Sequence, residues 1–193
     1  MEISTDRDQE LATAATGGDR NAFEILMRSS QQAVFSLACR LTKNESEADD
    51  ITQETFISAW KHIGSFRGEI PFKAWVLKIT LNKCRSFWRW SNIRRLVSLD
   101  QDTDRPDEQS LHETIPDKNL PQPDKAFESL DHSEKITRAL NALSLKQREA
   151  AILRGQGLEI REIAAIMKTA QGTIKAHLFE ARRKLALTLR EGL

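Results

Sequence analysis

The sequence predicts an all-α protein made of two small helical domains joined by a flexible acidic linker, the second domain containing a helix-turn-helix. Apolar residues recur at helical spacing from residue 9 to residue 91 and again after residue 125, with no alternating run typical of strands. Between these stretches, residues 98–124 hold four of the five prolines and few apolar side chains. A chain of 193 residues that is 39% hydrophobic is large enough for two small cores.

The first domain is expected over residues 1–97 as four helices. Gly17, Gly18 and Asp19 separate the first helix from the second, which carries a broad apolar face. A third helix is expected after Asn44, with an apolar stripe formed by Ala48, Ile51, Thr55, Ala59 and Ile63. The loop 64–71 ends it, and Pro71 suits the first turn of a fourth helix that runs from Phe72 to about Ser91.

The second domain is expected over residues 125–193. Helical periodicity returns with Phe127, Leu130, Ile136, Leu140 and Leu143. A helix through residues 147–155 follows, then a break at the glycines 155 and 157, then two final helices. The intervening residues 98–124 lack apolar periodicity and form the predicted linker.

Charge is segregated along the chain although the formal net charge is only +1. Residues 1–97 carry +2, residues 98–124 carry −6 and residues 125–193 carry +5. A near-neutral total therefore does not exclude a polyanionic partner, because the local basic surface governs binding. No apolar run approaches the roughly 20 residues of a membrane span, and the N-terminus is polar. We expect a cytoplasmic protein with no cleaved signal and no membrane insertion.

The last two helices carry a DNA-binding signal. Ile160, Ile163, Ala164 and Met167 form the inner face of a short helix, and residues 168–172 form a turn. The following helix has an inner stripe of apolar residues and places Lys175, Phe179 and Arg182 on an adjoining outward face. From Lys168 to Arg190 there are six basic residues and one acid. The pattern favours a helix-turn-helix that enters the major groove, and the alternative is a helical hairpin with a solvated basic face.

The fourth helix carries a second basic signal. Lys78, Asn82, Arg85 and Arg89 fall on one stripe, and residues 71–98 contain no Asp or Glu. The basic residues are interleaved with Trp75, Phe87, Trp88 and Trp90. Cations that hold phosphates beside rings that stack bases suit single-stranded DNA. The alternative is that the tryptophans belong to the core, and burial is the favoured interpretation for Trp90 and Trp75.

An acidic cluster lies at the start of the third helix and comprises Glu45, Glu47, Asp49, Asp50 and Glu54. Acids near a helix N-terminus complement the helix dipole, which explains part of the cluster. The polar edge of the same helix could meet a partner's basic helix, and it is formed by Gln53, Glu54, Ser58 and Lys61.

Enzymatic chemistry has little support in the sequence. The four histidines are scattered without metal-ligand spacing, and neither a phosphate-binding glycine loop nor a nucleophile elbow is present. Cys39 and Cys84 lie in helical patterns without paired spacing, so we expect buried or half-buried thiols. We expect no catalytic residue, no metal site and no cofactor.

Three stretches of this chain resemble the extracytoplasmic-function (ECF) sigma factors, a group of the sigma-70 family of bacterial transcription initiation factors. Residues 48–68 are similar to that family's core-polymerase-binding helix and the loop after it, residues 70–89 to its promoter-melting helix, and residues 158–185 to its C-terminal helix-turn-helix. The three stretches occur in the family's order with an acidic linker between them, and the resemblance extends over nearly the whole chain, from about Leu11 to Leu189.

The resemblance implies a sigma factor of this type. Its implied partners are core RNA polymerase and promoter DNA, the latter both as duplex and as melted strand. For core-polymerase binding the candidates are Asp49, Asp50, Gln53, Glu54, Ser58, Trp60 and Lys61. For minus-ten recognition and melting they are Ser65, Phe66, Arg67, Gly68, Trp75, Lys78, Asn82, Arg85, Trp88 and Arg89. For minus-thirty-five recognition they are Thr173, Lys175, Ala176, His177, Phe179, Arg182 and Arg183.

The chain departs from the family pattern at Glu180, where a basic residue is frequent, and at Lys168, where a glycine is common. The resemblance also implies an anti-sigma factor that restrains the protein, a monomeric free form, and a linker that threads the polymerase cleft. Two other classes stay open. One is a polymerase-independent helix-turn-helix regulator, and the other is a protein-interaction adaptor, which leaves both basic stripes unexplained.

Overall fold

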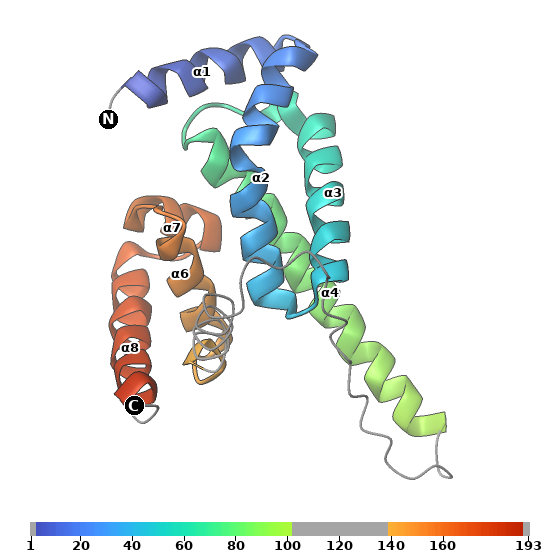
Figure 1. Cartoon of the computed structure of the whole chain (residues 1–193), viewed down its shortest axis with the longest axis vertical. Helices are drawn as coiled ribbons and strands as arrows, with labels where there is room; N and C mark the ends of the chain where they lie inside the picture. Colours follow the sequence, from blue (N-terminus) through green and yellow to red (C-terminus); the bar gives the residue numbers. More distant parts are fainter. Residues whose placement is uncertain (1–2, 102–138, 191–193) are drawn as a thin grey trace, which may run out of the picture.

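The computed structural model describes residues 3–101 and 139–190, and every regular element within these two ranges is helical (Figure 1). This confirms the predicted all-α class. The first domain contains α1 (Ile3–Thr16), α2 (Arg20–Thr42), α3 (Glu45–His62), the short 3-10 helix η1 (Ile63–Ser65) and α4 (Phe72–Gln101). The second domain contains α6 (Leu145–Gly155), α7 (Ile160–Met167) and α8 (Gln171–Arg190).

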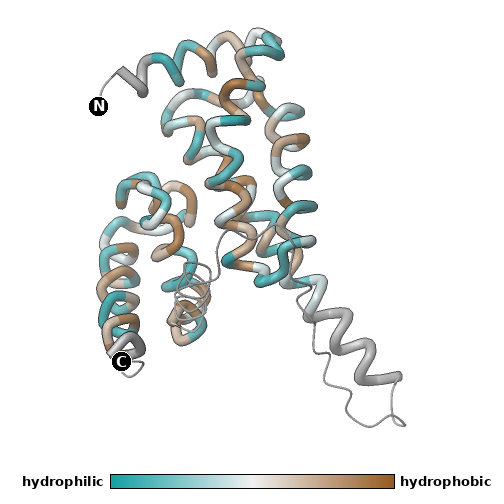
Figure 2. The backbone as a smooth tube through the Cα atoms, in the orientation of Figure 1, coloured by the Kyte–Doolittle hydropathy of each residue, from teal (hydrophilic) through white to brown (hydrophobic). Residues whose placement is uncertain are grey.

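Helix α2 is the centre of the first domain and packs against α1, α3 and α4. Hydrophobic and hydrophilic segments alternate along α2 and α3 in Figure 2, which follows from their helical periodicity. The stripe predicted on α3 is buried throughout, from Ala48 to Ile63. The buried apolar face of α2 includes Leu26, Val34, Leu37, Ala38 and Leu41, each at most 2% exposed.

Side-chain caps fix where α2 and α3 begin. The Asp19 carboxylate accepts hydrogen bonds from the backbone N–H groups of Asn21 (2.9 Å) and Ala22 (3.2 Å). Asn44 Oδ1 accepts from the N–H of Glu47 at 3.1 Å. Gly18 has a φ of 97°, a conformation that a side chain would strain. The helix breaks predicted at Gly17–Asp19 and at Asn44 are therefore confirmed.

Helix α4 is longer than the sequence predicted. It was expected to end at about Ser91, but it continues to Gln101 and so includes the first four residues of the predicted linker. No Gly or Pro lies between Ser91 and Gln101, so no breaker stops the helix before the first linker proline at position 106. The rest of the predicted linker lies outside the described residues, as do Phe127, Leu130 and Ile136.

Within residues 139–190, the described part of the second domain, α6, α7 and α8 pack against one another. Ser144 and Gln147 form a capping box at the start of α6, and Gly157, with a φ of 89°, lies in the turn after it. Ile152, Leu153 and Ile163 are buried between the helices. In the part of the chain that the structure describes, no helix is long and apolar enough to cross a membrane.

The two domains are in contact. Helix α7 packs on α4, and α6 packs on α2, so the second domain lies beside the first (Figure 1). Apolar side chains of both domains join one cluster of buried residues. The composition of the linker led us to expect separate domains, so this interface was not predicted.

Candidate nucleic-acid interface

The helix-turn-helix is formed by α7, the turn after it and α8. Ile163 and Ile174 are fully buried, and Leu178 is 8% exposed, so both helices are anchored by their inner faces. Lys168 ends α7 with a φ of 53°, the left-handed conformation in which glycine is usual. The sequence departure noted at Lys168 therefore falls on a strained residue of the turn.

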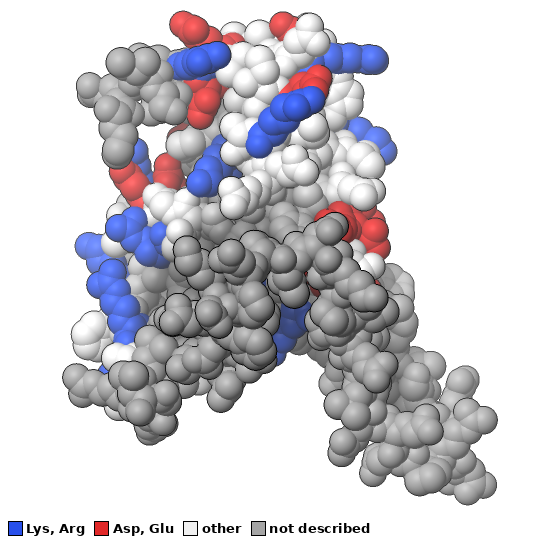
Figure 3. All heavy atoms as spheres, viewed as in Figure 1, with Lys and Arg blue, Asp and Glu red and all other residues white. Residues whose placement is uncertain are grey.

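The outward face of α8 is open to solvent. Its predicted residues are exposed except His177, which is half-buried, and Phe179 is the most open of the large apolar side chains at 67%. Basic side chains follow the outer edge of α8 at the left of Figure 3. Arg183 pairs with Glu180 at 2.9 Å, so the acid that departs from the family pattern engages one of the cations. The exposed basic side chains suit contacts to phosphates and base edges.

The basic stripe of α4 is divided between two environments. Lys78 and Asn82 line a shallow groove of about 410 Å³ together with Ser58, His62 and Ser65 from α3 and η1. This groove is open, and it brings together Ser58, predicted for polymerase binding, and Ser65, Lys78 and Asn82, predicted for minus-ten recognition. Two neighbouring segments, residues 58–65 and 75–86, thus meet along the N-terminal half of α4.

Arg85 occupies the second environment. Its Nε and Nη2 atoms donate to the two carboxylate oxygens of Glu149 in α6, at 2.8 and 2.7 Å. This hydrogen bonding raises the pKa of the Arg85 guanidinium, against the opposing effect of partial burial. The next arginine of the stripe, Arg89, donates to Ser86 Oγ at 2.9 Å and is exposed.

The tryptophans of α4 differ in exposure. Trp88 is half-buried, and its Nε1 donates to the carbonyl oxygen of Leu41 at 3.2 Å. Trp75 is half-buried against Phe66 and Phe72, as expected. Trp90 is 65% exposed, so the preference for burial was wrong at this position. Helix α4 continues past Trp90 to Gln101, and Figure 1 shows its C-terminal end projecting away from α2 and α3.

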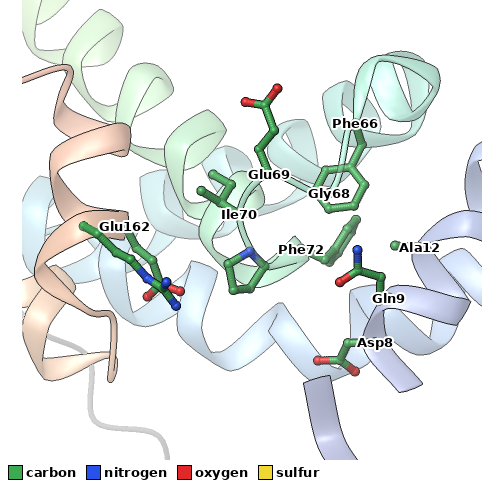
Figure 4. A pocket seen from close by; sticks show the side chains of 11 residues that line it. Asp8, Gln9, Ala12, Phe66, Gly68, Glu69, Ile70, Phe72 and Glu162 are labelled. Carbon is green, nitrogen blue, oxygen red and sulfur yellow. The ribbon is translucent and has the colours of Figure 1, made fainter. Parts of the chain in front are cut away.

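The loop that carries Ser65, Phe66, Arg67 and Gly68 borders a pocket of about 440 Å³. Its walls come from α1, the loop itself, the start of α4 and α7, as Figure 4 shows for Gln9, Gly68, Phe72 and Glu162. Gly68 has a φ of 71°, and a Cβ atom there would meet Gln9 Nε2 at 3.1 Å. Arg67 is exposed, whereas the Phe66 ring packs on Phe72 and belongs partly to the core.

The acidic edge of α3 faces solvent. Asp49, Asp50, Gln53, Glu54 and Lys61 are exposed, and Ser58 is half-buried in the groove beside Lys78. Glu54 pairs with Lys83 of α4 at 2.8 Å. Trp60 is half-buried, and its ring centroid lies 5.0 Å from that of Phe23, so Trp60 contributes to packing.

Neither cysteine has the properties of a reactive thiol. Cys84 is 1% exposed, and burial raises its pKa to about 12. Burial also raises the pKa of the half-buried Cys39. Both positions agree with the sequence prediction, and both thiols stay protonated near neutral pH.

Comparison with known proteins assigns the family. Residues 26–92 match the model of sigma-70 region 2, and residues 133–185 match the model of sigma-70 region 4. The ECF RNA polymerase sigma-E factor of Escherichia coli K12 is 30% identical over 179 residues, which cover 92% of each chain. The chain belongs to the ECF sigma factors. The RNA polymerase sigma-H factor of Pseudomonas aeruginosa is 27% identical over 95% of this ECF chain and 94% of its own length.

Two solved structures share the fold of this ECF chain. CnrH, in complex with the cytosolic domain of CnrY, has a TM-score of 0.70 and 25% identity, covering 96% of this chain and 99% of that one. The sigma factor RpoE of Bartonella quintana, in complex with the anti-sigma factor NepR, has a TM-score of 0.66 and 28% identity, covering 87% and 96%. Family and fold therefore agree with the resemblance found in the sequence.

Sequence reasoning missed the residues of the second domain that meet α4. Glu149 has no exposed surface, although it is a carboxylate, and its neighbours Ile152 and Leu153 are also buried. An acid on the apolar face of a helix was a signal available in the sequence, because buried carboxylates are rare without a partner. The partner itself, Arg85, could not be found this way because it lies 64 residues away.

Proposed function

We propose that this ECF sigma factor binds core RNA polymerase, directs it to promoters of a specialised, signal-responsive regulon and assists strand opening. As a transcription initiation factor it catalyses no reaction itself and acts in the cytoplasm, where the polymerase works. The observation that carries the proposal is the pair of basic surfaces in one family-matched chain. One is the exposed face of α8, and the other is the Lys78–Asn82 groove beside the acidic edge of α3.

In this proposal each surface has its own partner. The first domain binds the polymerase through Asp49, Asp50, Gln53 and Glu54, which are exposed on α3. The groove and the neighbouring loop bind the minus-ten element and its melted strand, because cations beside aromatic rings suit unstacked bases. The α8 face binds the minus-thirty-five element as duplex.

An anti-sigma factor is the proposed regulator of the free protein. RpoE of Bartonella quintana was solved in complex with the anti-sigma factor NepR, and it shares the fold of this chain at 28% identity. CnrH, which shares the fold at 25% identity, was solved with the cytosolic domain of CnrY. These relatives support the same mode of control here, with a regulator that releases the sigma factor in response to a signal.

Run-off transcription with core polymerase on a genomic fragment library tests the proposal, and Asp50→Lys tests the polymerase-binding edge. We expect promoter binding only in the presence of core enzyme, and we expect Asp50→Lys to weaken capture of core by about tenfold because it reverses a charge at the interface. The control is Glu24→Lys, an exposed reversal on α2. Circular dichroism should give unchanged melting for both variants.

Binding of duplex DNA by the free chain, with no dependence on core enzyme, would instead identify a polymerase-independent regulator. Loss of fold in Asp50→Lys would show a structural role for this acid, and the interface would then have to be sought elsewhere.

A further inference from the structure

The contact between the two domains contains a buried ion pair. The side chain of Glu149 is 1% exposed and receives both Arg85 hydrogen bonds, and Lys146 Nζ lies 3.6 Å from the same carboxylate. Two further polar contacts cross the interface. Lys73 Nζ donates to the backbone oxygen of Gln156 at 2.8 Å, and Gln156 Nε2 lies 3.2 Å from Ser36 Oγ.

Lys73 and Arg85 lie on α4 and Ser36 lies on α2, and the contacts of these three residues hold the second domain in register. Lys73 and Arg85 are 12 positions apart, which places them about 18 Å apart along the helix axis. Burial of the apolar side chains between the two domains favours contact but does not select one relative placement, because the hydrophobic effect is not directional. Directional hydrogen bonds at two separated points of α4 determine which closed arrangement forms.

The interface is not filled like a permanent core. A cavity of about 350 Å³ lies next to the ion pair and is lined by Leu41, Cys84, Trp88 and Leu145 as well as by charged residues. Leu145 remains 45% exposed beside it. Polar contacts around unfilled space are typical of domain interfaces that open, whereas permanent interfaces are closely packed.

The same guanidinium belongs to the stripe that we assign to melted DNA. An arginine that makes two parallel hydrogen bonds to a carboxylate presents the geometry with which arginine binds a phosphate. Arg85 cannot make both sets of contacts at once. The second domain also places Arg161 and Glu162 in the pocket beside the loop of Phe66 and Gly68 (Figure 4).

We propose that the Arg85–Glu149 pair is an internal latch, which holds the two domains closed in the free chain and must break before the α4 stripe can bind a DNA strand. The inference rests on the proposed function, because it assumes that α4 meets nucleic acid. Glu149 thus mimics a phosphate within the chain, and closure and strand binding exclude each other.

The latch is tested by small-angle X-ray scattering of the full chain and by the affinity of a short labelled single-stranded oligonucleotide. Glu149→Gln keeps the shape of the side chain but removes its charge, leaving Arg85 half-buried without a counterion. We expect a larger radius of gyration and an affinity raised about fivefold or more, since affinity scales with the open fraction. Lys73→Met should change both quantities in the same direction by less.

Two variants serve as controls. Glu24→Gln removes an exposed ion pair with Arg28 in the first domain and should change neither quantity. The exchange Arg85→Glu with Glu149→Arg should restore the closed radius of gyration, yet its affinity for the oligonucleotide should fall below that of the wild type because the stripe has lost a cation.

An unchanged radius of gyration in Glu149→Gln overturns the latch, and so does an increase without any gain in oligonucleotide affinity. Run-off transcription by the wild-type chain, measured on the same preparation, separates this inference from the proposed function. Normal transcription by the wild type, together with an unchanged radius of gyration in Glu149→Gln, would overturn the latch but not the proposed function. Absent wild-type transcription would overturn the proposed function, and the scattering result would still decide whether the pair holds the domains together.

Discussion

The basic stripe of α4 and the basic face of α8 have similar sequence patterns but different surroundings. Each carries cations seven residues apart, Lys78 and Arg85 on α4 and Lys175 and Arg182 on α8, together with aromatic residues. On α8, Lys175 and Arg182 are exposed, and no ion pair of either occurs among the described residues. On α4, the stripe residue Arg85 is held by Glu149, and Lys83, which lies beside the stripe, is held by Glu54. A basic pattern therefore predicts a charged helix face, but the neighbouring elements decide whether that face is free.

The difference follows from the position of each helix. Helix α4 lies between α3, which carries acids, and the second domain, which carries Glu149. Helix α8 lies at the edge of the molecule, with its inner face on α6 and α7 and its outer face in solvent (Figure 3). We infer that the α8 face can bind duplex DNA without rearrangement, whereas the α4 stripe has to be released first.

The largest expected effect comes from substituting the proposed DNA-binding residues of α8 and of α4 in separate variants. Replacing Lys175 and Arg182 with alanine should lower promoter recruitment of the holoenzyme by about tenfold or more, because each contact to DNA contributes about 1–3 kcal/mol. Replacing Lys78 and Asn82 should leave recruitment nearly unchanged but reduce strand opening. Filter binding and permanganate footprinting measure the two steps.

A template with a preformed bubble sharpens this prediction. It should restore transcription to the Lys78/Asn82 variant, because the bubble removes the need to separate the strands. It should not restore the Lys175/Arg182 variant, whose defect precedes opening. Equal rescue of both variants, or of neither, would contradict the assignment of strand opening to Lys78 and Asn82 in the N-terminal half of α4.

The sequence was sufficient for the helices and for the open face, but not for the contacts between distant elements. Helix caps at Asp19 and Asn44, and the buried stripe of α3, follow from local rules of capping and periodicity. Whether Arg85 is free or ion-paired depends on a carboxylate in the other domain, which no local pattern specifies. Trp90 was misjudged for the same reason, because burial requires a neighbouring element and α4 extends beyond its neighbours.

A smaller effect is expected from the exposed aromatic residue of each face. Trp90→Ala and Phe179→Ala should change the free energy of unfolding by no more than about 0.5 kcal/mol, since both rings are mostly in solvent. Trp90→Ala should weaken binding of single-stranded DNA, and Phe179→Ala should weaken binding of duplex promoter DNA. Fluorescence anisotropy with the two probes separates them.

Trp88 of α4 has a structural role and therefore serves as the comparison for Trp90. Trp88→Phe removes the hydrogen bond to the Leu41 carbonyl and should destabilise the first domain by about 1 kcal/mol. Thermal unfolding followed by circular dichroism measures this change. If Trp90→Ala destabilised the domain as much as Trp88→Phe, the exposed ring would have a packing role, and its assignment to nucleic acid would fail.

The last expected effect is local and concerns the turn that positions the open face of α8. Lys168 has a φ of 53°, where a residue with a Cβ atom is strained, so Lys168→Gly should stabilise the second domain by up to about 1 kcal/mol. Ala165→Gly is the matched control, because Ala165 is exposed within α7 and has helical geometry. That variant should destabilise by about 0.5–1 kcal/mol, since glycine is unfavourable in a helix. Opposite signs in chemical denaturation, with promoter selectivity retained, would show that the turn fixes the placement of α8 through its backbone. Destabilisation by both variants would instead assign a stabilising contact to the Lys168 side chain, and the strain argument at this position would be wrong.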